Sequence, residues 1–107
     1  MTVRVKGESG KVYEFEGPYP STSSLRDRSG VYVILCQTGD KLRVIDVGES
    51  ARLRTRVETH DRKECWEDEC RGHIKYAAYY IEHGKKPSRV DVERDIRNLY
   101  DPPCGEQ

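Results

Sequence analysis

Residues 30–60 read GVYVILCQTGDKLRVIDVGESARLRTRVETH, and this stretch decides the fold that the sequence predicts. It holds two β-rich runs, 31–36 and 42–47, joined by a connection that contains glycine. Two such runs with a short Gly-containing connection are typical of a β-hairpin. Gly48 ends the second run, and Ser50 is placed to cap a helix that follows it. The stretch therefore predicts strand, strand and helix in that order.

The predicted helix carries a cationic pattern. Arg52, Arg56 and His60 recur every four residues, so we expect them to lie along one helix face. Tyr32 lies in the first strand of the hairpin beside them. Guanidinium and imidazole groups in one stripe suit a phosphate oxygen as a ligand.

The remaining elements follow from the same kind of pattern. Residues 2–6 and 11–16 alternate apolar and polar side chains and predict an N-terminal hairpin. Residues 61–72 are dense in charge and predict a loop or a short helix, and residues 73–81 are aromatic and predict a third strand. A last helix is predicted to begin at the Ser88 cap, with Glu93 at the margin of its buried face. The residues of that buried face are Val92, Ile96, Leu99 and Tyr100.

The predicted fold class is α/β of the α+β kind. It is a small three-stranded, mainly antiparallel sheet flanked by helices, in the order β-β-α-β-α and preceded by the N-terminal β-hairpin. The hairpin forms an extension at residues 1–20, and residues 21–105 form the domain that carries the site.

Composition limits the function classes. The chain has 107 residues, which predicts one domain, and 19 basic residues balance 19 acidic ones. The zero net charge gives no support to avid nucleic-acid binding, so any affinity for phosphate must come from local clusters such as Arg52, Arg54 and Arg56. No apolar run approaches the ~20 residues of a membrane span, and the N-terminus lacks a secretory pattern. We expect a cytoplasmic protein that does not associate with membranes.

The four cysteines allow two interpretations. In a reducing compartment they are expected to be free thiols. The alternative is a structural zinc site built on Cys65, Cys70 and His73, although the chain has no Cys-x2-Cys pair.

The order and spacing of these features resemble the GIY-YIG nuclease family over residues 30–105. Gly30-Val31-Tyr32 stands at the first family motif and Asp46-Val47-Gly48 at the second, with Arg56 ten residues after Asp46. His60 and Glu93 stand at the family's histidine and metal-binding glutamate. Small stand-alone bacterial members look similar around 60–62 and 65–66.

The resemblance implies a metal-dependent endonuclease that hydrolyses DNA phosphodiester bonds. Tyr32 would be the general base, Arg56 would hold the phosphate, and His60 would assist by a hydrogen bond. Glu93 would bind one Mg²⁺ or Mn²⁺ ion, and Arg52 and Asp46 would contact the substrate. The protein would act on DNA as a homodimer or with a partner protein.

Three departures from the family pattern favour an alternative. Asp46 replaces a tyrosine, Glu49 replaces a common lysine, and Gly105 stands where the family has asparagine. Two of them add negative charge near a phosphate site. The alternative is a catalytically degenerate module that binds nucleic acid or protein. Asp46 itself would be either a second metal ligand or a strand-end carboxylate bonded to turn amides.

Each site residue also has a purely structural interpretation. Tyr32 would be a half-buried strand residue. Arg56 would pair with Glu49 or Glu58 on the surface. His60 would be a helix C-terminal residue. Glu93 would be an acidic residue of the first turn that the helix N-terminus stabilises, or an i,i+4 partner of Arg89 or Arg97.

Overall fold

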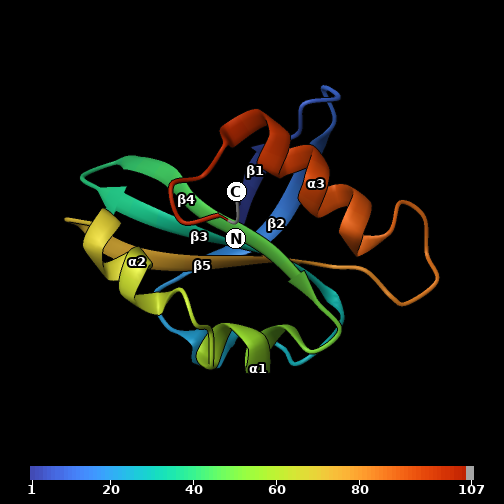
Figure 1. Ribbon diagram of the computed structural model, residues 1–107, viewed down its shortest axis with the longest axis horizontal. Helices are drawn as coiled ribbons and strands as arrows, with labels where there is room; N and C mark the ends of the chain where they lie inside the picture. Colours follow the sequence, from blue (N-terminus) through green and yellow to red (C-terminus); the bar gives the residue numbers. More distant parts are fainter. Residues whose placement is uncertain (106–107) are drawn as a thin grey trace.

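The computed structural model describes residues 1–105 and contains five strands, three α-helices and one short 3₁₀ helix (Figure 1). In chain order the elements are β1 (Thr2–Lys6), β2 (Val12–Tyr19), η1 (Thr22–Ser24), β3 (Gly30–Thr38), β4 (Lys41–Ser50), α1 (Leu53–Glu58), α2 (Lys63–Glu69), β5 (His73–Tyr80) and α3 (Arg89–Tyr100).

All five strands belong to one antiparallel sheet with the order β1-β2-β5-β3-β4. The predicted three-stranded sheet in the order β-β-α-β-α was therefore wrong. The N-terminal hairpin extends the sheet, because β2 pairs with β5 at Glu16↔Ala78 and Tyr19↔Tyr76. The charged stretch after His60 adds α2, a helix that the predicted order omits. Alternation along β2 predicted a strand but could not identify its distant partner.

Helices cover both faces of this sheet (Figure 1). On one face Val33, Val47 and Ala77 pack in a cluster with Val92 and Ile96 of α3. On the opposite face, residues of α1 and α2 pack against the sheet in a second cluster. Its members include Ile34, Ile45, Leu53, Val57 and Trp66. Side chains of β3 alternate between the two clusters, which explains why almost the whole strand is buried.

Helix α3 begins as predicted. The Ser88 side chain accepts a hydrogen bond from the Asp91 backbone N–H at 3.2 Å, and Asp101 ends the helix in a left-handed conformation (φ 45°). Val92 and Ile96 are buried as predicted, whereas Leu99 and Tyr100 are 43% and 40% exposed. The buried stripe is thus shorter than the periodicity indicates.

Helix α1 is shorter than predicted. It covers only Leu53–Glu58, so Arg52 lies before it and His60 lies after it. Ser50 accepts a hydrogen bond from the Arg52 backbone N–H at 3.0 Å instead of capping the helix. The predicted stripe of Arg52, Arg56 and His60 is therefore not formed on one helix.

All four cysteines are paired, as Cys36–Cys70 and Cys65–Cys104. The prediction of free thiols was wrong. The partners lie 34 and 39 residues apart in sequence and are brought together only by the packing of α2. Cys65 lies within α2 and Cys70 directly follows it, so the two disulfides attach this helix to β3 and to the segment after α3.

Within residues 1–105, no helix combines the length and the apolar character needed to cross a bilayer.

Candidate functional site

A small polar pocket opens where β3 and β4 meet the neighbouring helices. Its volume is about 230 Å³, and it is lined by Tyr32, Gly48, Glu49, Arg56, Arg62, Glu93 and Arg97. Three of the predicted catalytic residues thus face one space. A larger hollow of about 520 Å³ lies beside β1 and β4, but none of the predicted site residues lines it.

Tyr32 and His60 form a buried hydrogen bond behind this pocket. The Tyr32 Oη to His60 Nε2 distance is 2.6 Å, and the two side chains are almost fully buried. Gly48 makes room for the phenol ring, because a Cβ atom at this position would lie 2.1 Å from Tyr32 Oη. Gly48 therefore allows the Tyr32 side chain to reach the pocket.

The second nitrogen of His60 determines the direction of that bond. His60 Nδ1 accepts a hydrogen bond from the Arg62 backbone N–H at 3.0 Å. Nδ1 therefore carries no proton in the neutral ring, and Nε2–H donates to Tyr32 Oη. The Tyr32 hydroxyl proton is then available to a group in the pocket.

Both pKa values keep this pair neutral near pH 7. Burial, followed by the charge of Asp46, raises the pKa of Tyr32 to about 12, against opposing effects of Arg62 and Arg56. Burial, followed by the Arg62 and Arg56 cations, lowers the pKa of His60 to about 4. The pair is therefore a phenol hydrogen-bonded to an uncharged imidazole.

The lowered pKa of His60 predicts a loss of stability in mild acid. The unfolded imidazole binds its proton near pH 6.5 and the folded one near pH 4, so the unfolded state binds more protons between these values. We expect unfolding to become easier by about 3 kcal/mol as the pH falls from 7 to 4. Urea unfolding of the wild type and of His60→Gln across this range measures the difference. Equal pH dependence of the two proteins would contradict the prediction.

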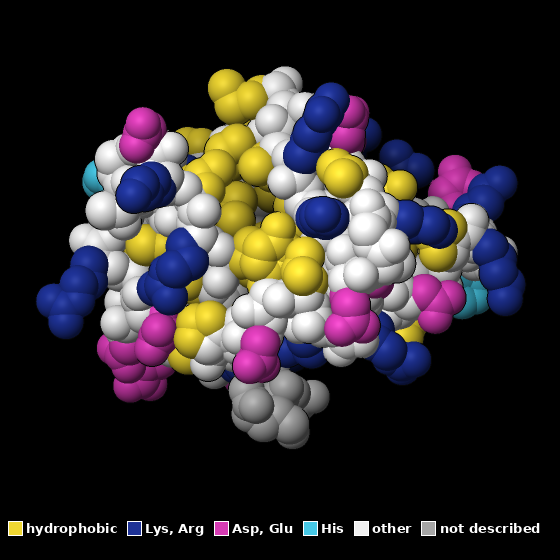
Figure 2. Space-filling view, turned by 90° about the horizontal axis from the view of Figure 1, so that it is seen from above, with side chains coloured by type: hydrophobic (Ala, Val, Ile, Leu, Met, Phe, Trp, Pro, Cys, Tyr) yellow, Lys and Arg dark blue, Asp and Glu magenta, His cyan; other side chains and the backbone are white. Residues whose placement is uncertain are grey.

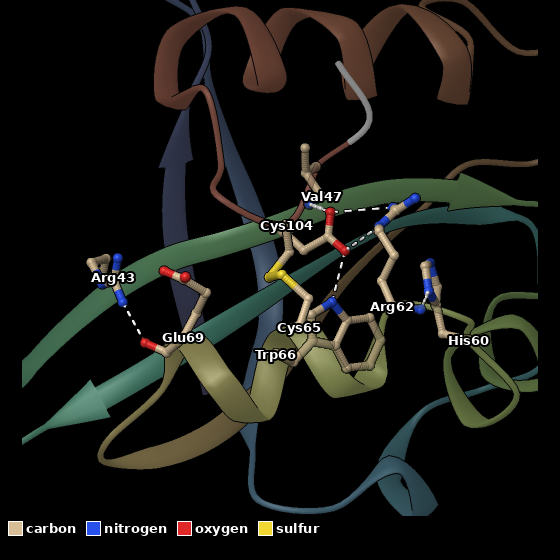
Figure 3. Close-up of a disulfide and its surroundings, with 9 residues drawn as sticks. Arg43, Val47, His60, Arg62, Cys65, Trp66, Glu69 and Cys104 are labelled. Atoms are coloured by element: carbon tan, nitrogen blue, oxygen red, sulfur yellow. Dashed lines mark hydrogen bonds and ion pairs between the residues drawn. A yellow bond between two sulfur atoms is a disulfide. The ribbon is translucent and has the colours of Figure 1, made fainter.

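Asp46 lies in the interior, where it organises one wall of the pocket. Its carboxylate is 0% exposed and accepts from Arg62 Nε at 2.9 Å, Arg62 Nη2 at 3.2 Å and Trp66 Nε1 at 2.7 Å. The Val47 backbone N–H donates to the same group at 2.8 Å. Figure 3 shows Arg62 and Trp66, the two side chains that donate to Asp46, beside the Cys65–Cys104 disulfide. Asp46 thus holds the Arg62 side chain that lines the pocket.

Helix α3 supplies the opposite wall through Glu93 and Arg97. Arg97 Nε donates to Glu93 Oε2 at 2.6 Å, and Arg97 Nη2 donates to the backbone carbonyl of Val47. Arg97 Nη1 is buried and has no hydrogen-bond partner within residues 1–105. Glu93 therefore forms the i,i+4 pair with Arg97 that one of its two structural interpretations predicts, and it also lines the pocket.

The two predicted arginines have different positions. Arg56 lines the pocket, and its Nη2 lies 3.3 Å from Asp61 Oδ1. Arg52 pairs with Asp27 at 3.3 Å, its side chain is 73% exposed, and it does not line the pocket. The structure therefore brings Tyr32, Arg56 and Glu93 into one pocket and leaves Arg52 outside it.

Sequence reasoning did not assign Arg62 or Arg97 to the site. Both line the pocket, and both are held by a carboxylate that the sequence did single out, Asp46 or Glu93. The i,i+4 spacing was the available signal for Arg97. No comparable signal existed for Arg62, because its partner lies 16 residues away on β4.

The donor chemistry of the pocket fits a magnesium ion shared with a substrate. Mg²⁺ is typically bound by one or two carboxylates together with water and phosphate oxygens. Glu49 and Glu93 both line the pocket, and their pairs with Arg89 and Arg97 use one oxygen of each carboxylate. Residues 1–105 contain no group of three or more His, Cys, Asp or Glu side chains that could hold a metal by themselves. A substrate phosphate would have to complete the site.

Comparison of the chain with models of protein families, with curated proteins and with solved structures found no match. The function is therefore argued from the geometry of the site.

Proposed function

We propose that the pocket binds a phosphodiester of DNA and hydrolyses it with one Mg²⁺ or Mn²⁺ ion. The observation that carries this proposal is the convergence of Tyr32 from β3, Arg56 from α1 and Glu93 from α3 on one pocket. Their hydrogen-bonding groups come from three separate elements, and His60 supports Tyr32 from behind.

The charge of the lining favours a phosphate. Arg56, Arg62 and Arg97 contribute three guanidinium groups, and Glu49 and Glu93 contribute two carboxylates. Guanidinium groups bind phosphate oxygens through charge-assisted hydrogen bonds. A metal ion held at the carboxylates would offset their negative charge next to the phosphate. The lining is therefore suited to a diester together with a divalent cation.

Each side chain has a role that follows from its contacts. Arg56 would bind a non-bridging phosphate oxygen, and Arg62 would face the same group from its anchor on Asp46. Tyr32, whose pKa is about 12, would donate its hydroxyl proton in a hydrogen bond to the phosphate or to the leaving oxygen. This pKa favours a donor role over the predicted role as a general base. A bound Mg²⁺ ion would polarise the phosphate and lower the pKa of a bound water.

Glu93→Gln tests the proposal directly. The substitution keeps the size of the side chain and removes its charge, so we expect metal-dependent DNA cleavage to fall at least ~100-fold. The assays are nicking of supercoiled plasmid and hydrolysis of bis(p-nitrophenyl) phosphate in Mg²⁺ or Mn²⁺. Glu67→Gln on the exposed face of α2 is the matched control and should retain full activity. Cleavage that persists in Glu93→Gln would contradict the proposal.

A second candidate is a module that binds DNA phosphates without cleaving them. It is favoured by the observation that both pocket carboxylates already pair with arginine, Glu49 with Arg89 and Glu93 with Arg97, at 2.6 Å each. The same assays separate the two functions. DNA binding that is weakened by Arg56→Ala, with no cleavage by the wild type in either metal, would identify the second candidate.

A further inference from the structure

A second hollow, with several basic side chains in its lining, lies between the start of β3 and the connection from β5 to α3. It consists of two adjoining cavities of about 250 Å³ and 310 Å³, which share Ser29, Glu82 and His83 in their linings. Lys85, Lys86 and Arg89 line the first cavity, and Arg28 and Tyr80 line the second. In Figure 2, basic and histidine side chains gather with acidic ones at the end of the molecule where this connection lies.

The cations of this hollow differ from those of α1 in their pairing. Arg52, Arg54 and Arg56 each form an ion pair, with Asp27, Glu58 and Asp61 respectively. By contrast, Arg28, Lys85 and Lys86 form no ion pair with any residue from 1 to 105. The one carboxylate in the two linings is Glu82, which is exposed. In a chain of zero net charge, these unpaired cations are available to an external anion.

Arg89 connects this hollow to the Tyr32 pocket. Its Nε donates to Glu49 Oε1 at 2.6 Å, and its Nη1 donates to Ser29 Oγ at 3.1 Å. Glu49 lines the Tyr32 pocket, and Ser29 lines both parts of the hollow. The Tyr32 pocket and this hollow therefore adjoin across the Arg89 side chain. A ligand with several phosphates along its length could occupy both.

We propose that this hollow is a second phosphate subsite for DNA, bound through Arg28, Lys85 and Lys86. The inference rests on the proposed function, because it takes the scissile diester to lie in the Tyr32 pocket. A neighbouring stretch of the same backbone then passes over Arg89 to the β5–α3 connection. Phosphate contacts of this kind position a nucleic acid without reading its sequence. The subsite would give a chain of zero net charge a local affinity for DNA.

The test is the double variant Lys85→Glu/Lys86→Glu, compared with Lys11→Glu/Lys41→Glu. All four lysines are exposed. In the control pair, Lys11 lies in the β1–β2 connection and Lys41 is the first residue of β4, and both variants change the net charge equally. Fluorescence anisotropy of a labelled DNA oligonucleotide, single-stranded and duplex, is followed from 50 to 200 mM KCl without divalent metal. We expect at least tenfold weaker binding for the Lys85/Lys86 variant than for the control. The slope of log affinity against log salt should fall by about 1.5–2 in magnitude.

Hydrolysis of bis(p-nitrophenyl) phosphate separates this inference from the proposed function, because the small diester occupies the Tyr32 pocket alone. We expect the Lys85/Lys86 variant to hydrolyse it at the wild-type rate. Equal loss of DNA binding in both double variants would overturn the subsite, even where the wild type cleaves the small diester. A wild type that cleaves no diester but binds DNA through Lys85 and Lys86 would support the subsite and overturn the hydrolysis. Absence of DNA binding by the wild type would overturn the subsite as well.

Discussion

Asp46→Ala is expected to lower the free energy of unfolding by about 3–5 kcal/mol, because it leaves a largely buried arginine without its counter-charge. The Asp46 side chain is 0% exposed and that of Arg62 is 20% exposed. The substitution also removes the acceptor of the Trp66 indole N–H at 2.7 Å. A buried donor without a partner costs about 1–3 kcal/mol of desolvation penalty, and the expected loss of about 3–5 kcal/mol already includes part of this cost.

Urea unfolding monitored by circular dichroism measures this effect. Asp40→Ala, in the exposed β3–β4 turn, is the control and should change stability by less than about 0.5 kcal/mol. Asp46→Leu combined with Arg62→Met should recover part of the loss, because a buried ion pair replaced by apolar side chains is often neutral. If the free energy of unfolding of Asp46→Ala lay within about 1 kcal/mol of the wild-type value, as for an ordinary substitution, the role given to this carboxylate would be contradicted.

Reduction of the two disulfides is expected to lower the free energy of unfolding by a similar amount or more. The bonds close segments with sequence separations of 34 and 39 residues. On a chain-entropy basis each such bond stabilises the folded state by roughly 4 kcal/mol. Both bonds hold α2, whose Trp66 contacts Asp46, so reduction should also release the wall of the pocket that carries Arg62.

Trp66 is the single tryptophan of the chain, and its fluorescence reports on α2. Unfolding in urea with and without a phosphine reductant gives the loss of stability. Cys65→Ser/Cys104→Ser should change the native Trp66 emission more than Cys36→Ser/Cys70→Ser, because Cys65 adjoins Trp66 in α2. Four titratable thiols in the native protein, or a midpoint that is insensitive to the reductant, would contradict the expectation. Disulfides are typical of oxidising compartments, so the same thiol count bears on the predicted cytoplasmic location.

The sequence predicted local elements well and their assembly poorly. Apolar alternation and glycine connections located both hairpins and the strand 73–81, because these patterns depend on near neighbours in the chain. The pairing of β2 with β5 depends on residues about 60 positions apart, such as Glu16 and Ala78, and has no local signature. Helix α1 ends early at Glu58, and its N-cap residue Arg52 makes no side-chain capping bond. The Thr55 backbone N–H in its first turn donates instead to Asp27 Oδ1, 28 residues earlier in the chain.

For the site too, the sequence predicted individual residues better than the contacts between distant ones. Tyr32, Arg56 and Glu93 were singled out by spacing and by a family resemblance, and the structure places them around one pocket. Arg62 was not singled out, because its place depends on Asp46, which the sequence analysis took for a substrate contact. The disulfide pairing was equally inaccessible, since four cysteines allow three connectivities and the sequence does not distinguish them.

The place of β5 in the sheet has a consequence for folding during synthesis. This strand lies between β2 and β3, although it leaves the ribosome after both of them. Until residues 73–80 have emerged, the β1–β2 and β3–β4 hairpins have no shared partner and remain two separate units. The pairings of β5 with β2 and β3 therefore form late, and such non-local pairings are typical of slow-folding β topologies. The nascent chain exposes the edges of β2 and β3 until residues 73–80 have left the ribosome.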